Sequence, residues 1–122
     1  MNHILLVEDA ESEALIMRTA IMEEFGMACD WAKTMAEGIK QLTERSKSLP
    51  YLCVVWDCIL PNGDYSDVAV VRGLAEAPLP GKRTTKVVAI SAIEKGDAII
   101  SKADMALILF EIRQAVREKV TA

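Results

Sequence analysis

The chain alternates short apolar runs with longer segments in which apolar residues recur every three or four positions. The run YLCVVW at 51–56 is apolar at successive positions, which predicts a strand covered on both faces of a sheet. Four further runs are interpreted as strands, at 3–7, 27–32, 86–91 and 98–101. Because these runs alternate with helical segments, the sequence predicts an α/β fold with a doubly wound, five-stranded parallel sheet.

The helical segments carry recognisable start and stop signals. Residues 12–25 place apolar side chains at helical spacing, among them Leu15, Ile21, Met22 and Phe25, and Gly26 ends this helix. Thr34 and Glu37 have the spacing of a capping box. The remaining helices are predicted at 34–46, at 65–77 and after Asp104, which is the expected N-cap of the final helix.

Composition adds limits to this picture. A chain of 122 residues with 52% apolar and 26% charged residues fits one domain spanning 1–122. The net charge of -4 and the scattered basic residues argue against binding to nucleic acid or to an anionic membrane surface. No apolar stretch is long enough to span a bilayer, and the first residues lack a secretory signal, so we expect a cytoplasmic protein.

Cysteine and histidine usage excludes further classes. The three cysteines have no paired metal-ligand spacing, and His3 is the only histidine. A disulfide framework or a zinc cluster is therefore not indicated, and the cysteines are expected to be reduced thiols in the core. A nucleophile activated by a separate histidine base is also not indicated.

Polar side chains stand at the ends of four predicted strands. Glu8 and Asp9 follow the first strand, Asp57 the third, Ser91 ends the fourth, and Lys102 follows the fifth. Because the carboxyl ends of parallel strands meet at one edge, these side chains are expected to converge. Crowded carboxylates stay ionised most easily around a divalent cation, and an oxygen-only set suits Mg²⁺. An aspartate there can form an acyl phosphate, while the hydroxyl and ammonium groups bind phosphoryl oxygens.

Each of these residues also has a simpler interpretation. Glu8 and Asp9 could be solvated acids at the start of a helix, and Asp57 could be a turn former. Ser91 could be an ordinary strand-end hydroxyl, and Lys102 a surface charge. Their order at successive strand ends favours the joint site.

Four motifs carry a resemblance to a known family. They are LLVED at 5–9, VVWDCILPNGD at 54–64, VVAISA at 87–92 and IISK at 99–102. In this order they resemble a response-regulator receiver domain, with the CheY-like, flavodoxin-like fold, over nearly the whole chain. The most specific piece is the aspartate followed four residues later by Pro61.

The resemblance implies roles for individual residues. Asp57 would be the phosphoacceptor, and Asp9 and Asp57 would bind Mg²⁺ together with the backbone carbonyl of Ile59. Glu8 would contact the metal through water. Ser91 and Lys102 would bind the phosphoryl group.

The resemblance also implies a function in two-component signalling. The chain would accept a phosphoryl group from a histidine kinase or a phosphotransfer protein and would signal by docking to a downstream protein, without being a turnover enzyme. We expect a stand-alone receiver, without an output domain after Ala122. Leu107 and Phe110 in the final helix would offer an apolar surface to a partner or to a second copy of the chain, as a homodimer.

Three features depart from the family pattern. Ala103 follows the lysine where the family usually has proline, and Ile99 takes the place of the switch aromatic. Only eleven positions separate Ser91 from Lys102. We therefore expect the fourth helix of the family to be missing or reduced and replaced by an extended crossover at 92–97.

Two other functions remain as alternatives. A pseudo-receiver would keep the fold and bind partners without phosphorylation, and the departures around Lys102 favour it. A haloacid-dehalogenase-like phosphatase would also use a strand-end aspartate with Mg²⁺. That class needs a second acid two residues after the nucleophile, where this chain has Ile59, so the sequence argues against it.

Overall fold

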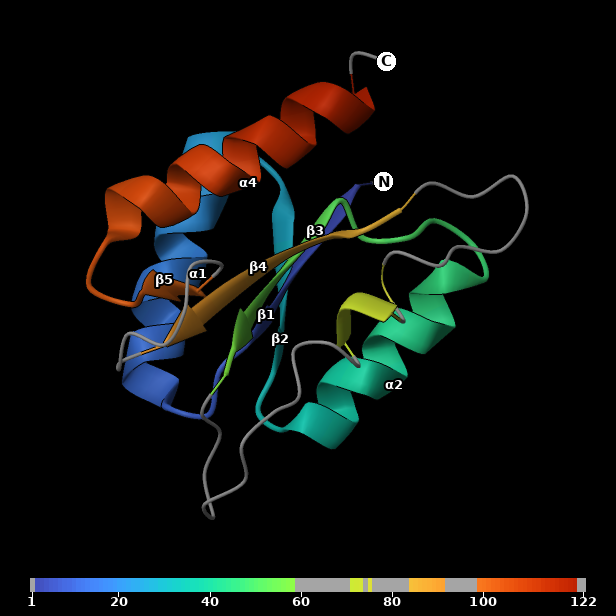
Figure 1. The fold of residues 1–122 in the computed structure, drawn as a ribbon, viewed down its shortest axis with the longest axis horizontal. Coiled ribbons are helices and arrows are strands. Elements are labelled where there is room, and N and C mark those ends of the chain that lie inside the picture. The colour runs from blue at the N-terminus through green and yellow to red at the C-terminus, as the bar shows by residue number, and fades with distance from the viewer. Residues whose placement is uncertain (1, 59–70, 74, 76–83, 92–98, 121–122) are drawn as a thin grey trace.

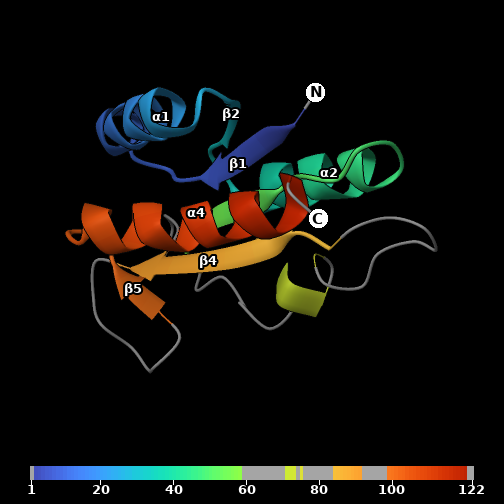
Figure 2. The same ribbon diagram turned by 90° about the horizontal axis from the view of Figure 1, so that it is seen from above.

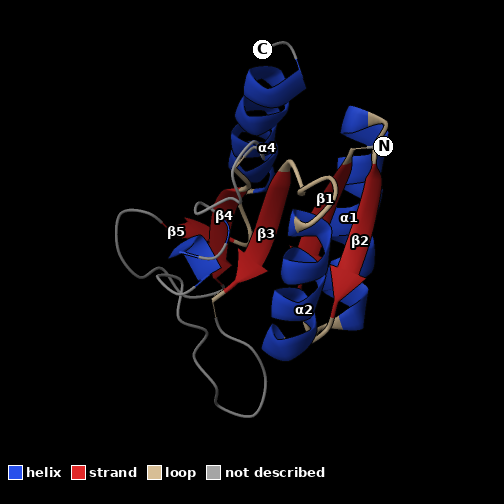
Figure 3. Cartoon of the chain, turned by 90° about the vertical axis from the view of Figure 1, so that its right-hand side faces the viewer, coloured by secondary structure: helices blue, strands red, loops and turns tan. Residues whose placement is uncertain are grey.

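The computed structural model describes residues 2–58, 71–73, 75, 84–91 and 99–120. Its five strands form one parallel sheet in the order β2-β1-β3-β4-β5, which confirms the predicted α/β architecture. The arrowheads of β2 and β3 point to the same edge of the sheet (Figure 3). The strands are β1 (His3–Val7), β2 (Ala28–Ala32), β3 (Cys53–Asp57), β4 (Lys86–Ser91) and β5 (Ile99–Ser101).

Helices cover both faces of this sheet (Figure 1). On one face, α1 (Glu11–Phe25) and α4 (Met105–Val120) pack over a buried cluster that includes Ile4 and Val55. On the other face, α2 (Met35–Ser46) packs over Leu5 and Val54. Figure 2 shows α4 lying along β4, with β5 beside it. Within the helix predicted at 65–77, residues 71–73 and 75 are helical, and the others lie outside the described residues.

The predicted helix caps are present in the structure. The hydroxyl of Thr34 accepts a hydrogen bond from the backbone N–H of Glu37 at 3.1 Å, and Asp104 accepts one from Leu107 at 3.1 Å. Gly26 ends α1 with a left-handed φ of 63°, a conformation that glycine adopts without the steric penalty of a Cβ.

The expected core face of α1 was partly wrong. Leu15 and Met22 are 64% and 44% exposed, whereas Ile21, from the same predicted set, is buried in one row with Ala14 and Met17. That row has the spacing i, i+3, i+7 of one helix face. Apolar residues occur on more than one side of this helix, so periodicity alone did not identify the side that packs on the sheet.

The central strand is covered on both sides, as its apolar run predicts. Every residue of β3 is buried, and Trp56 is fully buried against α2. A Cβ added at Gly38 would lie 2.9 Å from the Trp56 ring, so the helix reaches the strand only because residue 38 is glycine. This close packing fixes the strand at the point where Asp57 ends it.

The fifth strand is parallel to the fourth. Ile99, Ile100 and Ser101 pair with Ala89, Ile90 and Ser91. The chain therefore returns after β4 to form a parallel strand, as the sequence predicted. Lys102 follows this strand and lies at the same edge of the sheet as Asp57. The crossover predicted at 92–97 in place of a fourth helix lies outside the described residues.

Candidate functional site

Three carboxylates meet at the carboxyl edge of the sheet. Glu8 and Asp9 follow β1, and Asp57 is the last residue of the neighbouring strand β3. One oxygen from each lies within 4.8 Å of the other two. The exposed fraction is 0% for Glu8 and 2% for Asp57, so Glu8 is not the solvated acid of the simpler interpretation.

Backbone and side-chain contacts hold Glu8 in place. Its backbone N–H donates to the carbonyl of Ala32 at 3.0 Å, and its carbonyl accepts from Nε1 of Trp31 at 2.7 Å. Its Oε1 accepts a hydrogen bond from the N–H of Ala10 at 3.1 Å. Burial raises the pKa of Glu8 to about 7, although the hydrogen bonds from Lys102 and Ala10 oppose the rise.

Lys102 reaches into this group of acids. Its Nζ lies 2.7 Å from Oε2 of Glu8, 3.3 Å from Oδ2 of Asp57 and 2.5 Å from Oε2 of Glu13. The side chain is only 14% exposed, so Lys102 is not a surface charge. Burial by itself lowers the pKa of Lys102, but the hydrogen bonds to Glu13 and Glu8 and the charge of Asp57 outweigh burial, so the pKa is raised and the group stays protonated.

The backbone around Lys102 aims this side chain without a proline. The N–H of Lys102 donates to the carbonyl of Ser91 at 2.9 Å, which extends the pairing of β5 with β4 by one bond. The N–H of Ala103 donates to the hydroxyl of Ser101 at 3.2 Å, a bond that proline cannot make. The departure at Ala103 therefore coexists with a lysine that reaches Asp57.

Of the other two predicted site residues, the structure describes Ser91 but not Ile59. Ser91 is 1% exposed and ends β4, one position beyond Ile90, which pairs with Asp57. The strand pairing therefore brings Ser91 to the same edge as the acids. The carbonyl of Ile59, predicted to bind the metal, lies outside the described residues.

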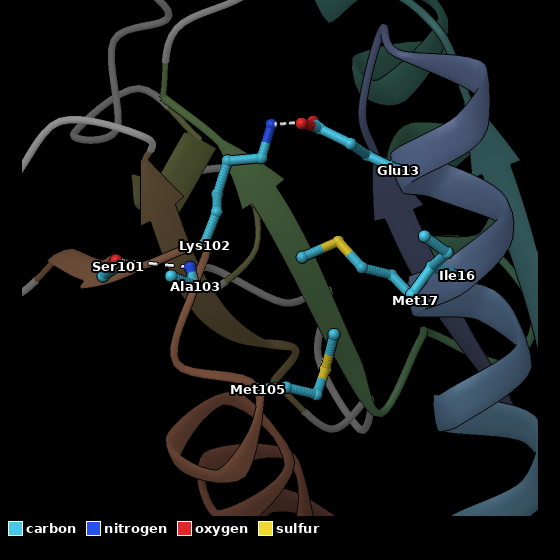
Figure 4. A pocket seen from close by; sticks show the side chains of 7 residues that line it. All are labelled: Glu13, Ile16, Met17, Ser101, Lys102, Ala103 and Met105. Atoms are coloured by element: carbon cyan, nitrogen blue, oxygen red, sulfur yellow. Dashed lines mark hydrogen bonds and ion pairs between the residues drawn. The ribbon is translucent and has the colours of Figure 1, made fainter.

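The sequence interpretation missed Glu13. This residue lies in the first turn of α1, four positions after Asp9. Its carboxylate meets Lys102 at the rim of a cavity of about 370 Å³ between α1 and the segment joining β5 to α4 (Figure 4). Met17 and Met105 supply apolar lining. The available signal was an acid in the opening turn of the predicted helix, four residues after Asp9.

The acids fit a magnesium site. Mg²⁺ prefers oxygen ligands and is usually held by one or two carboxylates together with waters. Glu8, Asp9 and Asp57 supply oxygens of this kind within a short distance of each other. Three carboxylates this close repel one another when they are ionised, and the ammonium of Lys102 supplies only one positive charge to compensate.

Comparison with solved structures identifies the fold. The receiver domain of NtrC4 from Aquifex aeolicus matches with a TM-score of 0.63 and 24% identity, covering 97% of this chain and 98% of that one. The beryllofluoride-activated NtrC4 receiver domain dimer matches with a TM-score of 0.70 and 27% identity, over 97% and 98%. The receiver domain of the histidine kinase CKI1 from Arabidopsis thaliana, complexed with Mg²⁺ and BeF₃⁻, has a TM-score of 0.68 and 19% identity, over 93% and 90%.

This chain therefore has the fold of a response-regulator receiver domain, of the flavodoxin-like class. No protein-family model matches the chain, and the curated proteins also give no match. In the part of the chain that the structure describes, no helix combines the length and the apolar character needed to cross a membrane.

Proposed function

We propose that this chain is a phosphoacceptor receiver of two-component signalling, with Asp57 as the residue that is phosphorylated. The observation that carries the proposal is the meeting of Glu8, Asp9, Asp57 and Lys102 at the carboxyl edge of a receiver-type sheet. A buried carboxylate at this edge, next to a cation, is suited to accept an anionic phosphoryl group.

In the proposed reaction, a carboxylate oxygen of Asp57 attacks phosphorus. The bond from phosphorus to the histidine nitrogen of a kinase or phosphotransfer protein breaks, and that nitrogen keeps the electron pair. Lys102 offsets charge on the phosphoryl oxygens, and Ser91 donates a hydrogen bond to one of them. Mg²⁺, held by Asp9, Asp57 and the Ile59 carbonyl and contacted by Glu8 through water, would neutralise phosphoryl charge.

The proposal includes partners of the site. A histidine kinase or phosphotransfer protein would supply the phosphoryl group, and a downstream protein would recognise the phosphorylated form. Leu107 and Phe110 on α4 are 40% and 48% exposed, which leaves an apolar surface for that target or for a second copy of the chain. A cytoplasmic location, expected from the sequence, belongs to the same proposal.

The test is phosphorylation with a small donor. Wild type, Asp57→Asn and Asp104→Asn are incubated with acetyl phosphate and Mg²⁺, and the intact mass is measured. We expect one base-labile phosphoryl adduct on wild type and on Asp104→Asn, and none on Asp57→Asn. Asp104→Asn is the matched control because asparagine also caps helices well.

The same experiment separates the alternatives. Equal labelling of wild type and Asp57→Asn would contradict the assignment of Asp57. The absence of any adduct on a folded wild-type chain would favour a pseudo-receiver, and continuous release of phosphate over many turnovers would favour a phosphatase. Because Lys102 reaches Asp57, the departures around this lysine no longer favour the pseudo-receiver.

A further inference from the structure

The ammonium of Lys102 lies against the oxygens that a metal would use. Of its three ion-pair partners among the described residues, Glu8 and Asp57 belong to the candidate magnesium cluster and Glu13 does not. A lysine ammonium and a divalent cation repel each other at such distances. Binding of Mg²⁺ to this cluster therefore requires that the ammonium give up part of its contact with Glu8 and Asp57.

Glu13 offers the ammonium a partner on the outer side of the site. Its side chain comes from α1 and is 52% exposed, whereas the Glu8 side chain is completely buried. Figure 4 shows Lys102 and Glu13 extending toward each other across the rim of the cavity, with Met17 and Met105 set below them. The lysine can thus move outward and keep a counter-ion.

We infer that Glu13 is a positioning residue, which holds the ammonium of Lys102 at the outer edge of the site while Mg²⁺ binds Glu8, Asp9 and Asp57. This inference rests on the proposed function, because it assumes that the cluster binds Mg²⁺. Glu13 keeps the ammonium of Lys102 near Asp57, where it can contact an incoming phosphoryl group. It also reduces the competition between this ammonium and Mg²⁺ for the carboxylates of Glu8 and Asp57. Without Glu13, both cations depend on the same carboxylates, and Mg²⁺ binding becomes weaker.

The test compares the Mg²⁺ affinity of Glu13→Gln with that of Glu11→Gln. Both residues are exposed acids in the first turn of α1, and both variants remove one negative charge. Glu11 is not an ion-pair partner of Lys102 in the described structure. The control therefore measures the general loss of charge near the metal, and the difference between the variants isolates the contact with Lys102.

Tryptophan fluorescence and the indole N–H signals in NMR spectra report Mg²⁺ binding without any phosphorylation. Nε1 of Trp31 donates to the carbonyl of Glu8, and Trp56 directly precedes Asp57. We expect the Mg²⁺ dissociation constant of Glu13→Gln to exceed that of Glu11→Gln by about two- to fivefold, the range for a partly exposed ion pair. In a Lys102→Met background, we expect the two variants to bind Mg²⁺ equally.

Equal Mg²⁺ affinities of Glu13→Gln and Glu11→Gln would overturn the inference and leave the proposed function intact. If the two variants differ in Mg²⁺ affinity by the same factor in the Lys102→Met background, the inference is also overturned, because the effect of Glu13 would not depend on the lysine. If Lys102→Met does not fold, the comparison of the two single variants decides. A folded wild type that binds no Mg²⁺ would overturn both this inference and the magnesium dependence of the proposed function.

Discussion

At the scale of single residues, burial gives the candidate site its chemical character. Glu8 and Asp57 are almost completely removed from water, and Lys102 is the cation that contacts both. Such charges are tolerated inside a protein when they are paired and hydrogen-bonded. The sequence predicted which residues would meet because each one ends or follows a strand.

The sequence did not predict the contact made by Glu13. Strand ends define one edge of the sheet, but the direction of a side chain on a neighbouring helix depends on how that helix is rotated against the sheet. The rotation of α1 is set by the burial of Ala14, Met17 and Ile21. The predicted apolar set combined the buried Ile21 with the exposed Leu15 and Met22, so it did not define this rotation. The position of Glu13 relative to Lys102 could therefore not be obtained from it.

The buried cysteines should be chemically inert in the native protein. Burial raises the pKa of Cys29 to about 12 and that of Cys58 to about 11, and Cys53 is fully buried. Because the thiolate is the reactive form, we expect a disulfide reagent at pH 8 to label none of the three thiols until denaturant is added. Rapid labelling of Cys58, the neighbour of Asp57, in the folded protein would contradict the described burial.

The same raised thiol pKa values predict an alkaline limit to stability. An unfolded cysteine loses its proton near its ordinary pKa of 9.0, whereas folded Cys29 and Cys58 keep theirs. The contribution of these two thiols to the free energy of unfolding is therefore fully present below pH 9 and is lost as the pH rises through 11 to 12. Denaturant titrations of wild type and Cys29→Ala across this range should show a smaller alkaline loss in the variant.

At the scale of elements, the contact between α2 and β3 connects the packing of the core to the site. Gly38 allows the helix to approach the ring of Trp56, and Trp56 immediately precedes Asp57. The sequence predicted α2 in spite of this glycine, with the capping-box spacing of Thr34 and Glu37 at its start. It gave no indication that the glycine is needed for a close approach, because that depends on which strand residue the helix meets.

Replacement of Gly38 with alanine should destabilise the protein. The added Cβ would lie 2.9 Å from both Trp56 and Val7, which are fully buried and have little room to move. Overpacking of this kind lowers the free energy of unfolding by about 1–3 kcal/mol. Gly73→Ala is the matched control, since nothing lies within 4 Å of its added Cβ, and this helical position should gain up to about 1 kcal/mol. Urea titrations of the two variants that shift in the same direction would contradict this account.

At the scale of the whole molecule, parallel strands and the helices between them collect distant residues at one edge. Residues 8, 57 and 102 are far apart in the sequence, yet their side chains meet because β1, β3, β4 and β5 run in the same direction. The alternation of apolar runs was enough to predict this arrangement. The fold therefore brings together acids that repel one another, and the repulsion acts against folding in the absence of a metal.

This coupling predicts that Mg²⁺ stabilises the whole chain. A ligand that binds only the folded state at a concentration 100-fold above its dissociation constant adds about 2.7 kcal/mol to the free energy of unfolding. For a domain of this size the midpoint of thermal unfolding should rise by roughly 10 °C. Asp9→Asn removes one candidate ligand and should lose most of this rise in stability. Asp30→Asn is the control and should keep the rise, because Asp30 lies on β2 and pairs with His3 and Tyr51 outside the cluster. EDTA should return wild type to its metal-free midpoint, and an equal rise in both variants would show that Mg²⁺ acts elsewhere on the molecule.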